Sequence, residues 1–202
     1  MIKAVLFDLD GVLVDAIEWH YEALNKALSL FGHGIDRQSH LSFYNGLPTK
    51  VKLDHLTKER GLPKSLHNII YEMKQIYTTD FINKCCRPDF QKQLLFKALK
   101  KRGLKIGVCS NSIRETLQLM LKKSNLIEEC DIIISNQDVE KNKPHPEMYQ
   151  KAMEELGINP AETIIVEDSP HGIQAAEASG GKVVIVKGVR DVCLGLLEPY
   201  LV

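Results

Sequence analysis

The fold follows from one stretch near the start of the chain, Val5-Leu6-Phe7-Asp8-Leu9-Asp10-Gly11-Val12. An apolar run there ends in two carboxylates that stand two residues apart. Residues two apart on an extended strand face the same side, so we expect Asp8 and Asp10 to point the same way. Two buried carboxylates repel each other, and burying them without a partner is unfavourable. The pair therefore predicts either a bound cation or a proton-transfer reaction at the end of the first strand.

Composition limits the classes of function. A chain of 202 residues suits one domain with a sizeable core, or one domain plus a small insert. Lys and Arg total 26, as do Asp and Glu, so no net charge directs the chain to nucleic acid or to anionic lipid. No apolar run reaches membrane-spanning length, and Asp8 and Asp10 interrupt the first hydrophobic segment too early for a signal peptide. The five cysteines lack CxxC spacing. We expect a cytoplasmic protein with reduced thiols that binds neither nucleic acid nor membranes.

Short β-branched runs alternate with helical patterns through most of the second half. Five strands are expected, at 2–7, 104–109, 131–134, 163–166 and 182–186. Helical patterns lie between the last four, at 113–123, 146–156 and 170–179. Strands that alternate with helices indicate a parallel sheet covered on both faces. The predicted fold class is therefore α/β, a Rossmann-like parallel sheet with helices on both faces.

The first gap between strands breaks this alternation. Roughly ninety residues separate the first two expected strands, whereas a βαβ crossover needs only about a dozen. The gap is helical throughout, with patterns at 16–31, 49–60, 65–82 and 89–102. We therefore predict a small α-helical cap domain over 16–86, inserted into a core made of 1–15 and 87–202. The place of the final segment, 193–202, stays open.

Chemically active side chains follow the expected strand ends. Ligands of open α/β sheets bind beyond the carboxyl ends of the strands. Four segments reach that edge: Asp8-Leu9-Asp10-Gly11, Ser110-Asn111-Ser112, Lys143-Pro144-His145-Pro146 and Glu167-Asp168-Ser169. The second and fourth stand just before expected helix N-termini, which attract anions. Acids, a hydroxyl group, an amide and a lysine are thus expected to converge on one site.

In this order the four segments resemble the motifs of the haloacid dehalogenase-like (HAD) superfamily, specifically its phosphatases and phosphomutases with a small helical cap. The resemblance implies that Asp8 is the nucleophile and Asp10 the general acid/base. It also implies a Mg²⁺ ion held by Asp8, Asp168 and the backbone carbonyl of Asp10, with Glu167 near it. Four further residues are implied to bind the phosphate group of the substrate: Gly11, Ser110, Asn111 and Lys143.

Electrostatics supports these roles. A carboxylate that attacks a phosphate dianion is repelled by about 4 kcal/mol for each pair of unit charges at ~4 Å and an effective dielectric of ~20. A divalent cation and the ammonium of Lys143 would offset most of that repulsion. Asp10 has to give a proton to the leaving oxygen, so we expect its pKa to lie above that of Asp8.

Three residues of the cap are candidates for substrate contact. Sugar-phosphomutase relatives carry a histidine at the position of His20 that influences the acid/base aspartate. The resemblance also implies substrate contacts from the turn 45–50, which includes Thr49, and from a lysine on a later cap helix, here Lys74. The alternatives are a surface or interface role for His20 and a solvated helix face for Lys74.

The leading functional hypothesis is a Mg²⁺-dependent phosphatase that hydrolyses a small phosphorylated metabolite, such as a sugar phosphate, through an aspartyl-phosphate on Asp8. The first alternative is a phosphosugar mutase like β-phosphoglucomutase, favoured by His20 and Lys74. Two departures argue against the mutase: Ala16 replaces the threonine that is usual there, and Thr49-Lys50 stands where mutases carry a substrate-binding arginine. The second alternative is a non-catalytic binding protein of the same fold, which the intact Asp8 and Asp10 disfavour.

Overall fold

The computed structural model describes residues 1–201 and contains a parallel sheet of five strands in the order β3-β2-β1-β4-β5. Their bounds are β1 (Ala4–Phe7), β2 (Lys105–Cys109), β3 (Ile132–Ile134), β4 (Thr163–Glu167) and β5 (Lys182–Ile185). The predicted α/β fold class is confirmed, and each strand falls inside or within one residue of its expected range. In the register Phe7 pairs with Val108 on one side and Val166 on the other, so Asp8 leaves the sheet at its centre.

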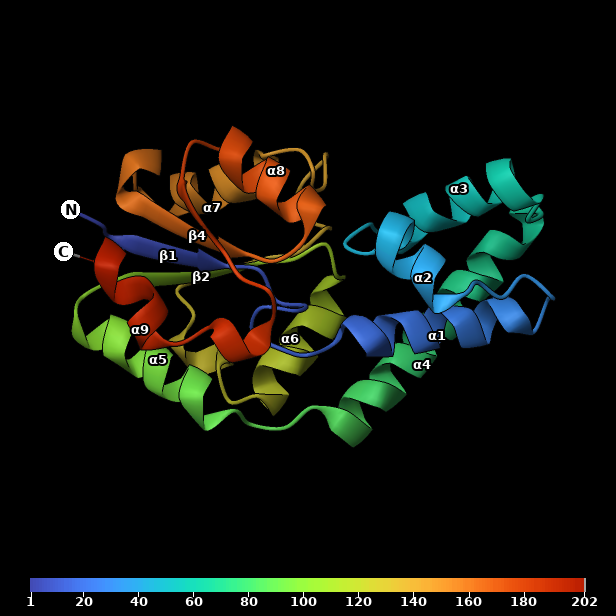
Figure 1. The fold of residues 1–202 in the computed structure, drawn as a ribbon, viewed down its shortest axis with the longest axis horizontal. Helices are drawn as coiled ribbons and strands as arrows, with labels where there is room; N and C mark the ends of the chain where they lie inside the picture. The colour runs from blue at the N-terminus through green and yellow to red at the C-terminus, as the bar shows by residue number, and fades with distance from the viewer. Residues whose placement is uncertain (202) are drawn as a thin grey trace.

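Helices cover both faces of the sheet (Figure 1). One face carries α5 (Phe90–Lys101), α6 (Arg114–Lys123) and α9 (Leu194–Leu197), and the other carries α7 (Glu147–Leu156) and α8 (Pro170–Ala178). Strand β1 is wholly buried. Val5 and Phe7 pack on the face that carries α5, α6 and α9, and Leu6 packs on the face that carries α7 and α8. A continuous apolar strand is what a two-sided parallel sheet requires.

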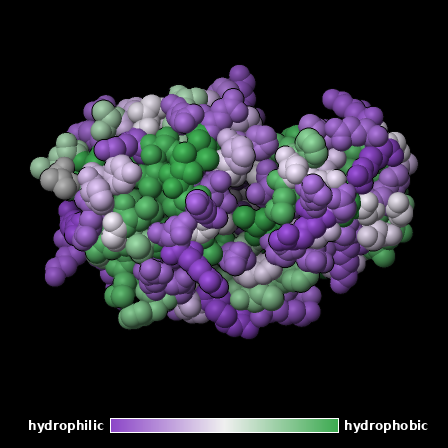
Figure 2. All heavy atoms as spheres, in the orientation of Figure 1, coloured by the Kyte–Doolittle hydropathy of each residue, from purple (hydrophilic) through white to green (hydrophobic). Residues whose placement is uncertain are grey.

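The cap is a separate helical layer beside the sheet (Figure 1). It comprises α1 (Ile17–Ser29), α2 (Arg37–Ser39), α3 (Thr49–Arg60) and α4 (His67–Cys85). Its own apolar cluster includes Leu24, Leu28, Leu53, Leu56 and Ile70. The helical insert is therefore confirmed, while the boundaries at 16 and 86 stay a prediction. The surface is hollowed between the two layers (Figure 2).

Two segments of the structure contain elements that the sequence did not predict. A π-helical turn, η1 (His40–Tyr44), follows α2, where Asp36 caps the helix by accepting from the Ser39 N–H at 2.8 Å. Such short elements contain too few residues for a periodicity to identify them. The segment 193–201 packs on the core through the fully buried Leu197; Val202 lies outside the described residues. The 3₁₀ turns in the described chain are η2 (Lys64–Leu66), η3 (Ile127–Glu129), η4 (Pro160–Glu162), η5 (Val189–Asp191) and η6 (Glu198–Tyr200).

Two further expectations were that no apolar run is long enough to span a membrane and that the cysteines are reduced. None of the helices within residues 1–201 combines the length and the apolar character needed to cross a membrane. All five cysteines are free thiols. Cys109 is fully buried behind the strand end of β2, and burial raises the pKa of its thiol to about 12. Cys109 and Cys86, which is also buried, therefore act as packing groups in this structure.

Candidate active site

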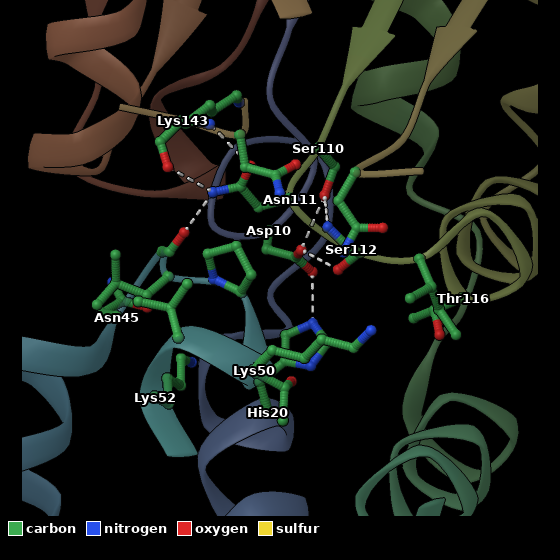
Figure 3. Close-up of a pocket in the computed structure, with 18 of the residues that line it drawn as sticks. Asp10, His20, Asn45, Lys50, Lys52, Ser110, Asn111, Ser112, Thr116 and Lys143 are labelled. Atoms are coloured by element: carbon green, nitrogen blue, oxygen red, sulfur yellow. Dashed lines mark hydrogen bonds and ion pairs between the residues drawn. The ribbon is translucent and has the colours of Figure 1, made fainter. Parts of the chain in front are cut away.

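A cavity of about 300 Å³ opens between the carboxyl edge of the sheet and the cap (Figure 3). The core lines it with the predicted residues Asp8, Asp10, Ser110, Asn111 and Lys143, and the cap with His20, Thr49 and Lys74. The other predicted residues, Gly11, Glu167 and Asp168, are not among the residues that line it in the described chain; Glu167 and Asp168 lie beside Asp8, and Gly11 lies against Asp168. The structure thus gathers the candidates from seven segments of the sequence at one place.

Lys143 lies at the centre of the acidic residues. Its Nζ is 2.7 Å from Asp8 Oδ1 and 2.7 Å from Glu167 Oε1, and it also donates to the carbonyl of Cys109 at 2.8 Å. Burial by itself lowers the pKa of Lys143, but the two carboxylates outweigh burial and hold the pKa above its ordinary value. Lys143 therefore stays charged and holds Asp8 in the wall of the cavity.

Tyr149 is a site residue that the sequence did not reveal. Its hydroxyl donates to Glu167 Oε1 at 2.6 Å, and its ring centroid lies 4.7 Å from Lys143 Nζ. Burial, together with the charge of Glu167, raises the pKa of the phenol, so it remains a donor. Tyr149 lies on the apolar face of the helix that follows Lys143, where an aromatic residue is typical of the core. The one signal that could have identified Tyr149 in the sequence is that a buried tyrosine hydroxyl needs a hydrogen-bond partner.

Removing this hydroxyl should weaken the fold. We expect Tyr149→Phe to lower the free energy of unfolding by about 1–3 kcal/mol, because a buried charged acceptor loses a donor. Urea denaturation measures the change. Tyr77→Phe is the matched control, since the Tyr77 hydroxyl makes no hydrogen bond within residues 1–201. Equal stability of the wild type and Tyr149→Phe would show that the bond to Glu167 contributes nothing.

Three carboxylates form a group that suits a divalent cation. Asp8, Glu167 and Asp168 each offer one oxygen, and these oxygens lie within 4.8 Å of one another. Asp168 Oδ1 is buried and has no hydrogen-bond partner within residues 1–201. Burial raises the pKa of Asp168 to about 7, with Glu167 and Asp10 adding to the rise. Carboxylate oxygens are the hard donors that Mg²⁺ prefers, and a cation among these three acids would offset their mutual repulsion.

Two glycines allow these acids to lie so close to the backbone. A Cβ on Gly11, whose φ is +94°, would overlap Asp168 Oδ2, and a Cβ on Gly172 would overlap the carboxylate of Glu167. Both positions therefore admit only glycine without a shift of an acid. Gly11 acts here on the placement of Asp168, and its direct contact with a phosphate stays a prediction.

Asp10 has its own set of polar partners. Its Oδ1 lies 2.9 Å from His20 Nε2, and its Oδ2 accepts from Ser112 Oγ at 3.0 Å and Ser110 Oγ at 3.3 Å (Figure 3). Lys74 Nζ lies 3.3 Å from His20 Nδ1. An ammonium only donates, so His20 Nδ1 accepts from Lys74 and Nε2–H donates to Asp10.

The expected order of the two aspartate pKa values is wrong. Burial raises the pKa of Asp10, but the charge and hydrogen bond of His20, with Ser112 and Lys74, outweigh it and leave the pKa below its ordinary value. Burial raises the pKa of Asp8 well above its ordinary value, although Lys143 opposes the rise. The expectation failed because it did not include the groups that bind the Asp10 carboxylate: His20 of the cap, and Ser110 and Ser112 of the loop after β2.

Asn111 connects the two layers. Its side-chain N–H group donates to the carbonyl of Gly46 in the cap at 2.8 Å and to that of Lys143 at 3.2 Å. Its Oδ1 accepts from the Lys143 N–H at 3.2 Å. The amide is therefore engaged in fixing the Lys143 loop against the cap, and phosphate binding by Asn111 stays a prediction.

Lys52 is a second residue that the sequence analysis did not single out. It lies on α3, is only 7% exposed, and lines the cavity on the cap side. Burial lowers its pKa to about 7, the charge of Lys74 adds to the fall, and Asp10 opposes it. A lysine whose pKa is lower in the folded chain destabilises the fold wherever it is charged, below about pH 7, and this penalty fades between pH 7 and 10.

Lys52→Met removes this penalty. We expect the variant to be more stable than the wild type at pH 6, and the difference to shrink by about 1–3 kcal/mol as the pH rises to 9. Urea denaturation of both proteins at the two pH values measures this. Other groups titrate in both proteins and cancel in the difference. Parallel stability profiles would contradict the assigned burial of the charge.

Fold and site together define a capped α/β protein with an acidic site of the kind that binds a divalent cation. The chain belongs to the haloacid dehalogenase-like hydrolases, whose family model matches residues 5–186. It is 30% identical over 195 residues to the pyrophosphatase PpaX of Bacillus mycoides (strain KBAB4), covering 92% of this chain and 83% of that one.

Solved structures share the fold. β-Phosphoglucomutase from Clostridium difficile superposes with a TM-score of 0.86 at 23% identity, over 100% of this chain and 97% of the other. CbbY from Rhodobacter sphaeroides in complex with xylulose-1,5-bisphosphate has a TM-score of 0.84 at 22% identity, over 96% and 91% of the two chains. These likenesses establish the capped architecture. The family match makes the chain a hydrolase of this family, and the curated proteins it is similar to include a putative phosphatase and pyrophosphatases.

Proposed function

We propose that this chain is a Mg²⁺-dependent phosphatase that hydrolyses a small phosphorylated metabolite through an aspartyl-phosphate on Asp8. The observation that carries the proposal is the position of Asp8. It stands at the central strand end, lines the cavity, and lies 2.7 Å from Lys143 and beside Glu167 and Asp168. A carboxylate held there by a permanent cation is placed to attack a phosphorus atom in the cavity.

Asp8, Asp168 and the backbone carbonyl of Asp10 would hold the Mg²⁺ ion, with Glu167 beside them. The bound ion would offset negative charge on the phosphate oxygens. Lys143 adds a second positive charge, and Ser110 offers a hydroxyl donor to the phosphate.

The reaction needs two proton transfers by Asp10. The Asp8 oxygen forms a bond to phosphorus while the ester P–O bond breaks, and Asp10 gives its proton to the leaving oxygen. Asp10 then takes a proton from the water that attacks phosphorus, which frees phosphate and restores Asp8. The phosphate dianion raises the pKa of Asp10 when it binds, because like charges disfavour the carboxylate. His20 and Lys74 hold Asp10 in position through both steps.

The test is hydrolysis of p-nitrophenyl phosphate and of a panel of small phosphate esters, with Mg²⁺ and with excess chelator. We expect release of inorganic phosphate that depends on Mg²⁺. No Mg²⁺-dependent turnover on any ester of the panel would contradict the proposal and favour a non-catalytic binding protein.

A phosphosugar mutase is the second candidate, and the contacts of Asp10 with His20 and of His20 with Lys74 favour it. The pair Thr49-Lys50, at the place where mutases carry a substrate-binding arginine, argues against it. Phosphorus NMR with β-glucose 1-phosphate and glucose 1,6-bisphosphate separates the candidates. Formation of glucose 6-phosphate without free phosphate would replace the phosphatase by the mutase.

A further inference from the structure

Asn111 is the residue at which the cap meets the loop of Lys143. Its side-chain amide pairs with both polar groups of the Lys143 backbone, because Nδ2 donates to the Lys143 carbonyl and Oδ1 accepts from the Lys143 N–H, each at 3.2 Å. The second N–H of the amide donates to the Gly46 carbonyl at 2.8 Å. Figure 3 shows Asn111 between Lys143 and the cap turn that begins at Asn45. An amide has two N–H groups, so Asn111 has none left for a phosphate in this arrangement.

The cap turn 45–50 makes one hydrogen bond to the core within residues 1–201, and this bond is the contact of Gly46 with Asn111. Gly46 has a φ of +77°, and a Cβ there would stand 3.3 Å from Ser169 Oγ. Glycine therefore allows the backbone of the turn to lie close to Ser169 and Asn111. The turn thus packs on two loops of the core, and one of these loops binds Lys143.

Lys143 is held at both of its ends. Its Nζ contacts Asp8 and Glu167, whereas its backbone has Asn111 as its one hydrogen-bond partner in the described chain. The direction of the Lys143 backbone therefore depends on the Asn111 amide. That amide in turn has a third partner in Gly46, and a side chain that loses one of its partners regains rotational freedom.

We propose that Asn111 is a positioning residue that holds Lys143 against Asp8 and Glu167 while the cap turn 45–50 is packed on the core. The cation of the acidic site thereby depends on the cap, which lies on the opposite side of the cavity. Lys143 is fully aligned in those molecules in which cap and core both face the substrate. The catalytic meaning of this link rests on the proposed phosphatase function, whereas the link itself is a property of the substrate-free chain.

Amide proton exchange of the substrate-free protein, followed by NMR, tests the link without turnover. Gly46→Ala places a methyl group against Ser169 and should push the turn away from the core. We expect exchange of the Lys143 N–H to become about three- to tenfold faster, the ratio that corresponds to the loss of one neutral hydrogen bond. The Glu140 N–H, which donates to Glu147 Oε1 at 2.8 Å in the same loop, should keep its rate.

Gly61→Ala is the matched control. Gly61 is also a cap glycine, its φ is +69°, and an added Cβ would meet nothing within 4 Å. The control therefore carries the same backbone strain and should leave exchange of the Lys143 N–H unchanged. In Asn111→Ala this exchange is already fast, so adding Gly46→Ala should change it no further. Thermal unfolding checks that each variant is folded.

Unchanged exchange of the Lys143 N–H in Gly46→Ala overturns the link. An equal acceleration by Gly61→Ala, or by Gly46→Ala in the Asn111→Ala background, also overturns it, because the effect would then not pass through the Asn111 amide.

Kinetics separates positioning from phosphate binding by Asn111. In Asn111→Ala we expect kcat for p-nitrophenyl phosphate to fall about tenfold, with KM within about twofold of the wild type. A raised KM at unchanged kcat would show direct binding of the phosphate and overturn the proposal. A wild type without any turnover would contradict the phosphatase function, and the exchange experiment would still decide the link.

Discussion

Asp8→Asn is expected to reduce Mg²⁺-dependent hydrolysis of p-nitrophenyl phosphate by about 10⁴-fold or more, because an amide cannot form the phosphoryl bond. The substitution keeps the shape of the side chain. It also removes one of three mutually repelling acids, and burial had already raised the pKa of Asp8 well above its ordinary value. The variant should therefore fold, and its loss of turnover can be assigned to chemistry.

Steady-state kinetics with both proteins at equal Mg²⁺ gives the ratio. Asp15→Asn is the matched control: it makes the same chemical change at an exposed aspartate a few residues further along the chain and should leave turnover within twofold. Turnover by Asp8→Asn within tenfold of the wild type would remove Asp8 from its role as nucleophile. The proposal would then have to give way to direct attack by water.

The sequence predicts those parts of the site that sit at ends of regular elements. Asp8 and Ser110 each follow a buried apolar strand, and Glu167 is the last residue of another. Because parallel strands end at one edge of the sheet, the convergence of these residues needs no knowledge of packing. The bounds of α3 (Thr49–Arg60) could also be predicted, because a proline precedes the helix and Gly61 follows its last residue.

Contacts that arise only from packing of the cap on the core could not be predicted. Ser112 and His20 determine the pKa of Asp10 together, yet they lie 92 residues apart and come from different layers. Lys52 is a surface-type residue on a polar helix, and only the packing of α3 turns it inward. Tyr149 lies on the apolar face of α7, and its hydroxyl donates a hydrogen bond to Glu167.

Lys143→Met tests how far the acidic site depends on its internal cation. We expect the free energy of unfolding without Mg²⁺ to fall by about 3–5 kcal/mol, because the variant leaves buried carboxylates without the charge that pairs them. Turnover should fall by about 10²–10³-fold, since a positive charge facing the phosphate is lost. Urea denaturation and steady-state kinetics measure the two effects.

Mg²⁺ makes the result specific to the site. Adding Mg²⁺ should restore more stability to Lys143→Met than to the wild type, because in the variant the ion is the one charge left to offset Asp8, Glu167 and Asp168. Lys141→Met, an exposed lysine two residues away, should change neither stability nor its Mg²⁺ response. If Mg²⁺ stabilised Lys143→Met and the wild type equally, the ion would not bind beside Lys143, and the three carboxylates would need another role. A larger response in the variant would instead place the ion and the ammonium on the same group of acids.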